Sequence, residues 1–197
     1  MNVFDILGPV MVGPSSSHTA GAVRIGNISR RLLGERPVKA DIFLHGSFAL
    51  TGVGHGTDKA IIAGLLGMDT DDMRIPESME IAKKDGLKFN ISTVNLKDAH
   101  PNSVLLKLKG EKGRELEIAA ASVGGGKISI EQIDGIDTHF SGDYHTLVVH
   151  NADRPGHVAE VASALAHHAV NIASLNLYRD KSCLLYTSDA ADDRISV

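Results

Sequence analysis

The chain has 197 residues, of which 43% are hydrophobic and 22% charged, and its net charge is −4. This composition is typical of a globular protein and excludes a disordered chain. No apolar run reaches the ~18 residues that span a bilayer, and we expect no secretory signal. Scattered basic residues and 4% aromatics argue against a nucleic-acid-binding surface. We therefore expect a cytoplasmic protein that binds neither membranes nor nucleic acids.

The predicted elements of the first region, residues 1–140, place helices before most of the strands. The helices are expected to begin near Ser17–Thr19, at Thr57 and at Pro76, because capping residues or a proline precede apolar residues at helical spacing there. Glycines at 110 and 113 indicate a hairpin turn. The expected strands are 41–44, 88–94, 104–109, 114–122 and 127–133. This order favours an α+β fold over a doubly wound sheet.

The second region is expected to be a separate small domain, residues 145–197, after a polar linker over 135–145. Its pattern predicts a strand at 146–149, a turn, a helix at 155–169 and a strand at 171–178. The apolar stripe expected to be buried on that helix consists of Val158, Val161, Ala162 and Leu165. The order of these elements is the beginning of a ferredoxin-like pattern.

The segment Gly13–Thr19 is the first candidate site. We expect Ser15, Ser16, Ser17, His18 and Thr19 to be its binding residues. Backbone N–H groups and the positive end of the helix dipole converge at a helix start, so this loop is suited to binding a carboxylate or a phosphate. The structural alternative is a helix cap, but a single hydroxyl group is enough for capping.

The second candidate is His55, which lies between Gly54 and Gly56 on what we expect to be a loop. Flanking glycines leave the imidazole unobstructed, and the pKa of histidine near neutral pH suits a general base. The alternative is a solvated turn histidine without a role. The ten histidines include no pair with the i, i+4 spacing of zinc proteases, and we expect no metal site on this chain.

The third candidate is the turn from Asn151 to His157, with Pro155 expected at the first helical position. We expect Asn151, Asp153, Pro155 and Gly156 to be effector-binding residues. The glycine and the open N–H groups of this turn can bind the carboxylate of a small amino acid. A plain capped helix is the alternative.

Three segments together resemble the β subunit of iron–sulfur-dependent L-serine dehydratase. They are GPVMVGPSSSHTAGAVRIG, LHGSFALTGVGHGTDKAIIAGLLG and HNADRPGHVAEVASALAHHAVNIASL. The resemblance covers residues 1 to about 180. It implies a substrate-binding-type α+β domain followed by an ACT regulatory domain, and conversion of L-serine to pyruvate and ammonia with an α subunit.

The resemblance also implies roles for the candidate residues. His55 would be the base that removes the Cα proton, the 15–19 loop would hold the substrate carboxylate, and the 151–157 turn would bind an effector such as serine. A 4Fe–4S cluster on the α subunit would bind the substrate hydroxyl as a Lewis acid. Cys183 is the single cysteine of this chain, so its thiol cannot hold such a cluster alone. We also expect a homo- or hetero-oligomer.

The C-terminal tail departs from the family pattern, which continues with a further strand, a helix and a final strand. After Asp180 the chain reads KSCLLYTSDAADDRISV, and its acidic, alanine-rich end SDAADDRISV has neither strand alternation nor a helix-length apolar stripe. We expect residues from about 182 to be foreign to the family, which would leave the ACT domain truncated. The alternative function is a non-catalytic amino-acid-binding regulatory module.

Overall fold

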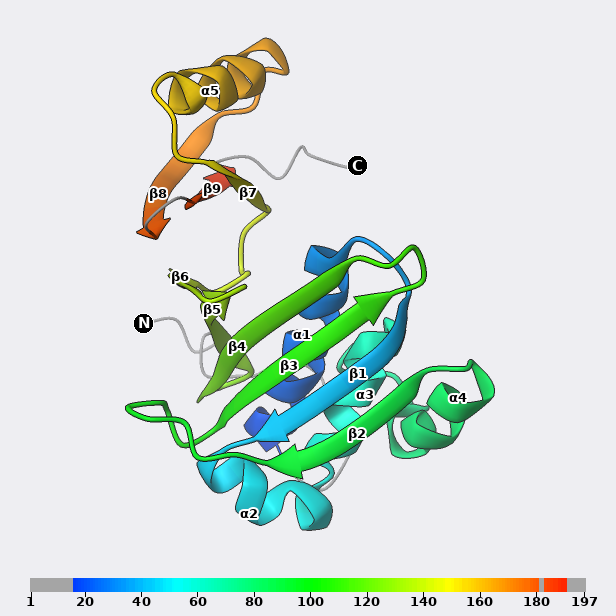
Figure 1. Ribbon diagram of the computed structural model, residues 1–197. Helices are drawn as coiled ribbons and strands as arrows, with labels where there is room; N and C mark the ends of the chain where they lie inside the picture. The colour runs from blue at the N-terminus through cyan, green and yellow to red at the C-terminus, as the bar shows by residue number, and fades with distance from the viewer. Residues whose placement is uncertain (1–15, 181–182, 191–197) are drawn as a thin grey trace. The chain divides into compact units, whose positions relative to one another are not determined.

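The computed structural model describes residues 16–180 and 183–190, and the chain forms two compact units, 1–135 and 136–197 (Figure 1). The helices and strands, in chain order, are α1 (Ser16–Leu33), β1 (Pro37–Leu44), α2 (Gly46–His55), α3 (Thr57–Leu66), a short 3-10 helix (Ile75–Glu77), α4 (Ser78–Lys84), β2 (Lys88–Thr93), β3 (Ser103–Gly110), β4 (Glu115–Gly124), β5 (Lys127–Ile133), β6 (Ile136–Phe140), β7 (Thr146–Ala152), α5 (His157–His167), β8 (Ile172–Asp180) and β9 (Cys183–Ala190). None of the described helices is both long and apolar enough to cross a membrane.

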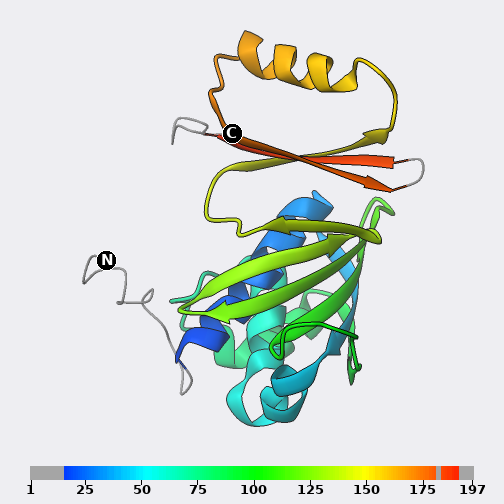
Figure 2. The same ribbon diagram turned by 90° about the vertical axis from the view of Figure 1, so that its left-hand side faces the viewer.

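A mixed six-stranded sheet has the order β2-β1-β3-β4-β5-β6, which confirms the α+β class. The strands β1 and β2 are parallel, because α2, α3 and α4 connect them, and β3, β4 and β5 follow as antiparallel neighbours. The helices α1 and α3 lie side by side behind this sheet (Figure 1; Figure 2 gives the view turned by 90°).

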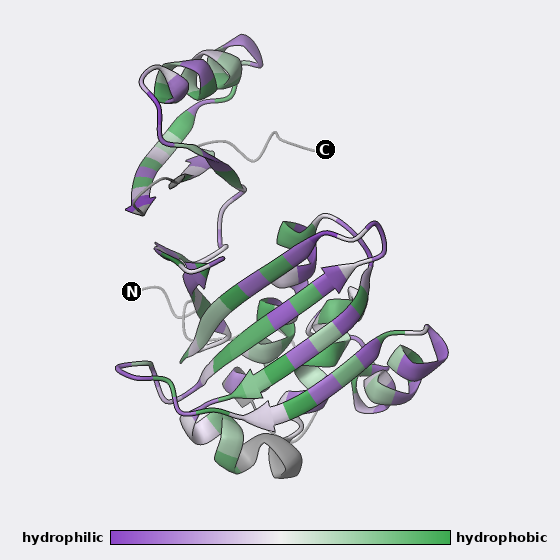
Figure 3. Ribbon diagram, viewed as in Figure 1, coloured by the Kyte–Doolittle hydropathy of each residue, from purple (hydrophilic) through white to green (hydrophobic). Residues whose placement is uncertain are grey.

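The core of the first unit follows from strand alternation. Ile42, Leu106 and Ile118 are direct cross-strand neighbours and are fully buried. Ile25 of α1 and Ile61 of α3 are also fully buried, and each such side chain contributes roughly 1.5–3 kcal/mol. Asp41, Lys107 and Glu117 are neighbours of these residues on the strands and face the other side of the sheet. The alternation of polar and apolar residues is visible in Figure 3.

Most of the sequence-predicted elements of the first unit are confirmed. The first helix begins at Ser16, and the hairpin between β3 and β4 turns at residues 110–113. One prediction in this unit is wrong: the expected loop before Thr57 contains the helix α2. Three glycines lower the helix propensity of that segment, but Phe48 is 1% exposed, and its burial outweighs the local preference.

The expected linker over 135–145 is a second correction, because β6 occupies Ile136–Phe140 within it. Its side chains alternate between buried and exposed, with Ile136 and Thr138 buried. This short strand lies between two turns with glycines at 135 and 142. The five-residue length and the polar side chains of β6 hid the alternation that defines a strand.

The second unit has a three-stranded sheet of order β7-β9-β8 and one helix, α5. No strand was predicted after residue 178, but β9 lies between its two antiparallel partners and includes the first three residues of the acidic end. Four consecutive residues, 185–188, are buried, and a strand covered on both faces need not alternate. The origin of the residues after 182 stays a prediction.

The helix α5 begins at His157, two residues later than predicted, because Gly156 takes a left-handed conformation with φ 97°. Its apolar stripe faces Ile172, Leu175 and Tyr186. The stripe is only half-buried: no residue of α5 is fully buried, and Val158 is 37% exposed. The prediction of a buried stripe is therefore wrong in degree.

Candidate functional site

The start of α1 contains four of the five residues predicted to hold a carboxylate. Ser16, Ser17, His18 and Thr19 form its first turn, whereas Ser15 lies outside the described residues. The first turn of α1 has no acidic residue. No carboxylate of this turn therefore compensates the positive end of the helix dipole.

The start of α1 is attached to the sheet through β4 and the turn that follows it. His18 Nδ1 lies 3.4 Å from Ser122 Oγ. One and a half turns further along α1, Arg24 Nη1 donates a hydrogen bond of 2.9 Å to the carbonyl oxygen of Gly126. These two contacts fix the direction in which the first turn of α1 points.

His55 is the last residue of α2, directly before Gly56, instead of a member of a long loop. Gly56 has φ 73°, a left-handed conformation that glycine adopts without strain, and α3 begins at the next residue, Thr57. The chain thus reverses within one residue between two helices. Thr57 is 3% exposed, so the start of α3 is packed against its surroundings.

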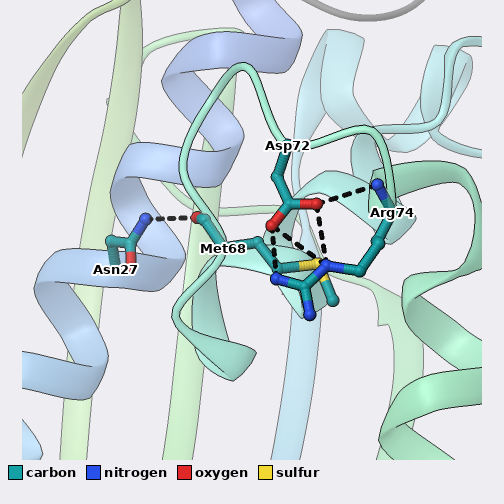
Figure 4. Close-up of polar contacts among 4 residues, drawn as sticks. All are labelled: Asn27, Met68, Asp72 and Arg74. Carbon is teal, nitrogen blue, oxygen red and sulfur yellow. Dashed lines mark hydrogen bonds and ion pairs between the residues drawn. The ribbon is translucent and has the colours of Figure 1, made fainter.

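The helices α1 and α3 run in the same general direction. A Cβ on Gly26 would overlap the carbonyl oxygen of Ile61, and one turn further along both helices Arg30 Nη1 donates a 3.2 Å hydrogen bond to Leu65 O. Beyond the end of α3, Asn27 Nδ2 donates a 2.7 Å hydrogen bond to Met68 O (Figure 4). Because the contacts advance together along both helices, the two N-termini lie on the same side of the crossing. One holds the serine-rich turn and the other follows His55 and Gly56.

His45 links the end of β1 to α2, and the sequence reasoning did not assign it a role. Its Nδ1 accepts a 3.2 Å hydrogen bond from the backbone N–H of Leu96. Gly46 follows with φ 55°, and a Cβ there would lie 3.0 Å from Pro101 Cα. The imidazole therefore anchors the loop after β2 beside the start of α2.

Two of the four predicted effector-binding residues differ from the prediction. One lies in a strand instead of the turn, and the other forms an ion pair. Asn151 belongs to β7, and its Oδ1 accepts from the N–H of Ala152 at 2.8 Å. Asp153 forms an ion pair with Arg179, with 2.6 Å between Oδ2 and Nε. Pro155 and Gly156 make up the turn before α5. The turn thus brings a paired carboxylate and a guanidinium to the start of α5.

The described residues include no group of three or more His, Cys, Asp and Glu side chains that could hold a metal ion. The one cysteine, Cys183, begins β9. A 4Fe–4S cluster takes several thiolates. One cysteine cannot supply these thiolates, and the family resemblance places the cluster on the α subunit.

Ser122 is the residue near the serine-rich turn that the sequence reasoning missed. It lies 104 positions from His18, and no spacing rule joins residues so far apart. The one available signal was a polar residue after the apolar run 119–121, at the end of the strand expected over 114–122.

Comparison with known proteins assigns the chain to a family. Residues 2–133 match the model of the serine dehydratase beta chain. The chain is 44% identical over 178 residues to the probable L-serine dehydratase beta chain of Bacillus subtilis, covering 90% of this chain and 80% of the relative. It is 40% identical over 194 residues to the L-serine dehydratase beta chain of Peptoniphilus asaccharolyticus, covering 98% and 87%.

A third relative has a longer chain. The L-serine dehydratase of Helicobacter pylori is 34% identical over 155 residues, which cover 67% of this chain but 34% of the relative. The part that matches this chain is therefore a minor portion of the Helicobacter pylori protein. In the two beta chains, by contrast, the matching part makes up most of the protein. The family match over two thirds of the sequence and the two beta-chain relatives agree: the chain belongs to the serine dehydratase beta chain family.

Proposed function

We propose that this chain is the β subunit of an L-serine ammonia-lyase that converts L-serine to pyruvate and ammonia together with an α subunit. The observation that carries this proposal is the near full-length similarity to two proteins named as L-serine dehydratase beta chains. The longer relative from Helicobacter pylori supports the α subunit, because two thirds of its length has no counterpart here. The same names do not favour a non-catalytic regulatory module.

The carboxylate of serine binds at the start of α1 in this proposal. Backbone N–H groups of the first turn, the hydroxyls of Ser15, Ser16 and Ser17, and the side chains of His18 and Thr19 supply the donors. The absence of an acidic residue from the first turn of α1 favours an anion there. Binding the carboxylate at a helix start leaves the amino group and the hydroxymethyl group of serine directed away from the helix.

The general base is His55 in this proposal. Its place at the junction of α2 and α3 puts it before a helix whose N-terminus lies on the same side of the crossing as that of α1. Removal of the Cα proton and loss of the hydroxyl group as water leave aminoacrylate. This product tautomerises to an imine, and water hydrolyses the imine to pyruvate and ammonia.

The thiolates for the 4Fe–4S cluster come from the α subunit in this proposal, because this chain has one cysteine. The second unit acts as an ACT-type regulatory domain that binds an amino acid at the turn before α5. Arg179, beside Asp153, supplies a cation for the carboxylate of this effector. The cytoplasmic location and the oligomeric assembly remain predictions from the sequence.

The test is co-expression with a cluster-bearing α subunit under anaerobic conditions and an assay of pyruvate from L-serine. His55→Ala is expected to lower kcat about 10²–10⁴-fold, the usual contribution of a general base, with the visible absorbance of the cluster unchanged. His167→Ala, on the exposed face of α5, is the matched control and is expected to retain full turnover. Unchanged turnover of His55→Ala would remove His55 as the base.

A further inference from the structure

The side chain of Ser122 is completely buried between β4 and the first turns of α1. Its Oγ lies 3.4 Å from Nδ1 of His18, at the long end of the hydrogen-bond range. A hydrogen bond of this length is weak, and its main effect is to orient the imidazole ring of His18. A buried hydroxyl proton requires an acceptor, and an unprotonated ring nitrogen is one.

Gly21 provides the space that this serine occupies. Gly21 lies one turn after His18 on α1, and a Cβ at this position would overlap Ser122 Oγ and lie 2.9 Å from Ser122 Cβ. Ile128 limits the same space from β5, with its Cγ2 3.7 Å from that Cβ position. The hydroxyl of Ser122 is therefore confined beside the helix at a place where another residue at 21 would displace it.

We propose that Ser122 is a positioning residue for His18. Its hydroxyl donates to Nδ1, which keeps the proton of the neutral imidazole on Nε2 and turns this N–H away from β4. The serine-rich turn then presents an N–H donor in addition to its backbone donors. The donor role of the hydroxyl is part of this proposal, because a serine hydroxyl can donate or accept, and the ligand of the N–H group rests on the proposed function.

The tautomer matters because a carboxylate only accepts hydrogen bonds. With the proton on Nε2, the ring donates to the substrate carboxylate. With the proton on Nδ1, the ring would point a lone pair at the carboxylate and repel it. A buried partner on the opposite side of the ring is the usual way in which proteins fix this choice.

The first experiment measures the tautomer of His18 by ¹⁵N NMR of the imidazole in the full chain, at a pH where the ring is neutral. The His18→Gln variant identifies the signals. The wild type is expected to carry the proton on Nε2, and Ser122→Ala is expected to give a mixture of the two tautomers. Ser29→Ala is the matched control, since it removes another fully buried hydroxyl from α1, and it is expected to leave the tautomer unchanged.

A wild-type proton on Nδ1, or the same tautomer in Ser122→Ala as in the wild type, would overturn the proposal. The wild-type result decides between the tautomers even where a variant folds poorly. Because no partner subunit or turnover is needed, this experiment stands apart from the proposed function.

The second experiment compares Ser122→Ala in two backgrounds of the assembled enzyme. With His18 present, it is expected to raise KM for L-serine about tenfold, as for one lost hydrogen bond to a charged group. In His18→Gln, whose amide presents an N–H without any tautomer, the same change is expected to alter KM less than twofold. Equal effects in both backgrounds would show a merely structural serine and would contradict the proposal. A wild-type enzyme that produces no pyruvate would contradict the proposed function instead.

Discussion

Gly26 of α1 and Gly64 of α3 lie against each other where the two helices cross. A Cβ on Gly26 would lie 2.9 Å from the Cα of Gly64, and one on Gly64 would lie 2.8 Å from the Cα of Gly26. These atoms belong to backbone that cannot move aside as a flexible side chain can. The glycine pair thus sets how closely α1 approaches α3, and with it the placement of both helix starts.

Gly26→Ala is expected to destabilise the protein by about 1–3 kcal/mol, the usual range for overpacking, although alanine is the better helix former. The measurement is the free energy of unfolding in urea. Gly86→Ala is the matched control: Gly86 has φ 78° with open space around it, so the change introduces backbone strain but no clash. A cost for Gly26→Ala no larger than that of the control would contradict the close contact.

Ser29→Ala is expected to leave the free energy of unfolding unchanged or to raise it. Ser29 is fully buried, and its Oγ has no hydrogen-bond partner among the described residues. Burial of the hydroxyl therefore costs desolvation free energy that no hydrogen bond offsets. Ser78→Ala is the counterpart, since Ser78 Oγ donates to Lys59 O at 2.7 Å, and it is expected to destabilise by about 1 kcal/mol. Urea unfolding of both variants distinguishes the two buried serines.

Asp72 is expected to make the stability of the chain depend on pH in the acidic range. The guanidinium of Arg74 lies 2.6 Å from Asp72 Oδ2 (Figure 4) and lowers the pKa of this carboxyl from 3.8 to about 2. A lowered pKa stabilises the fold above the pKa of the unfolded chain, and the contribution is lost as the pH falls toward 2.

The difference in urea midpoint between wild type and Asp72→Asn should therefore be largest above pH 4 and vanish near pH 2. Asp71→Asn, at the exposed neighbouring carboxylate, is the control and should show no such trend. A difference that stayed constant from pH 7 to pH 2 would contradict the role of the ion pair.

Exchanging the charges of Lys109 and Glu115 is expected to stabilise the sheet. Lys109 pairs with Glu115 at 2.9 Å on one side but lies opposite Lys39 in the register of β1 and β3. In the double variant Lys109→Glu with Glu115→Lys, a negative charge on β3 lies between positive charges on β1 and β4, so that the charges alternate across the three strands. A higher urea midpoint at low salt, abolished at about 1 M NaCl by screening, is the expected result. A gain that persisted at high salt would point to packing instead.

Local patterns predicted the parts of the fold that depend on short-range chemistry. The start of α1, the hairpin at 110–113 and the strand Lys127–Ile133 all follow from capping residues, glycines and alternation. The helix α2 could not be predicted in this way, because the burial of Phe48 by distant elements stabilises it. β9 was missed for another reason: four consecutive residues, 185–188, are buried, so this strand does not show the alternation of a half-buried strand.

The candidate site was predictable only in part. The serine-rich turn and the reversal at Gly56 follow from the sequence, because both are marked by residues with special backbone preferences. The contribution of Ser122 was hidden, since tertiary packing alone brings β4 to the first turn of α1. The ion pair of Asp153 with Arg179 likewise joins residues on different elements.

The separation between His18 and Ser122 has a consequence for biosynthesis. A nascent chain that has just delivered the serine-rich turn must wait for 104 more residues before the anchoring strand exists. At about 5–20 residues per second, translation imposes a delay of roughly 5–20 s. During that interval the turn of the ribosome-bound chain has no contact with Ser122, so its tertiary contacts are completed only after β4 has left the exit tunnel.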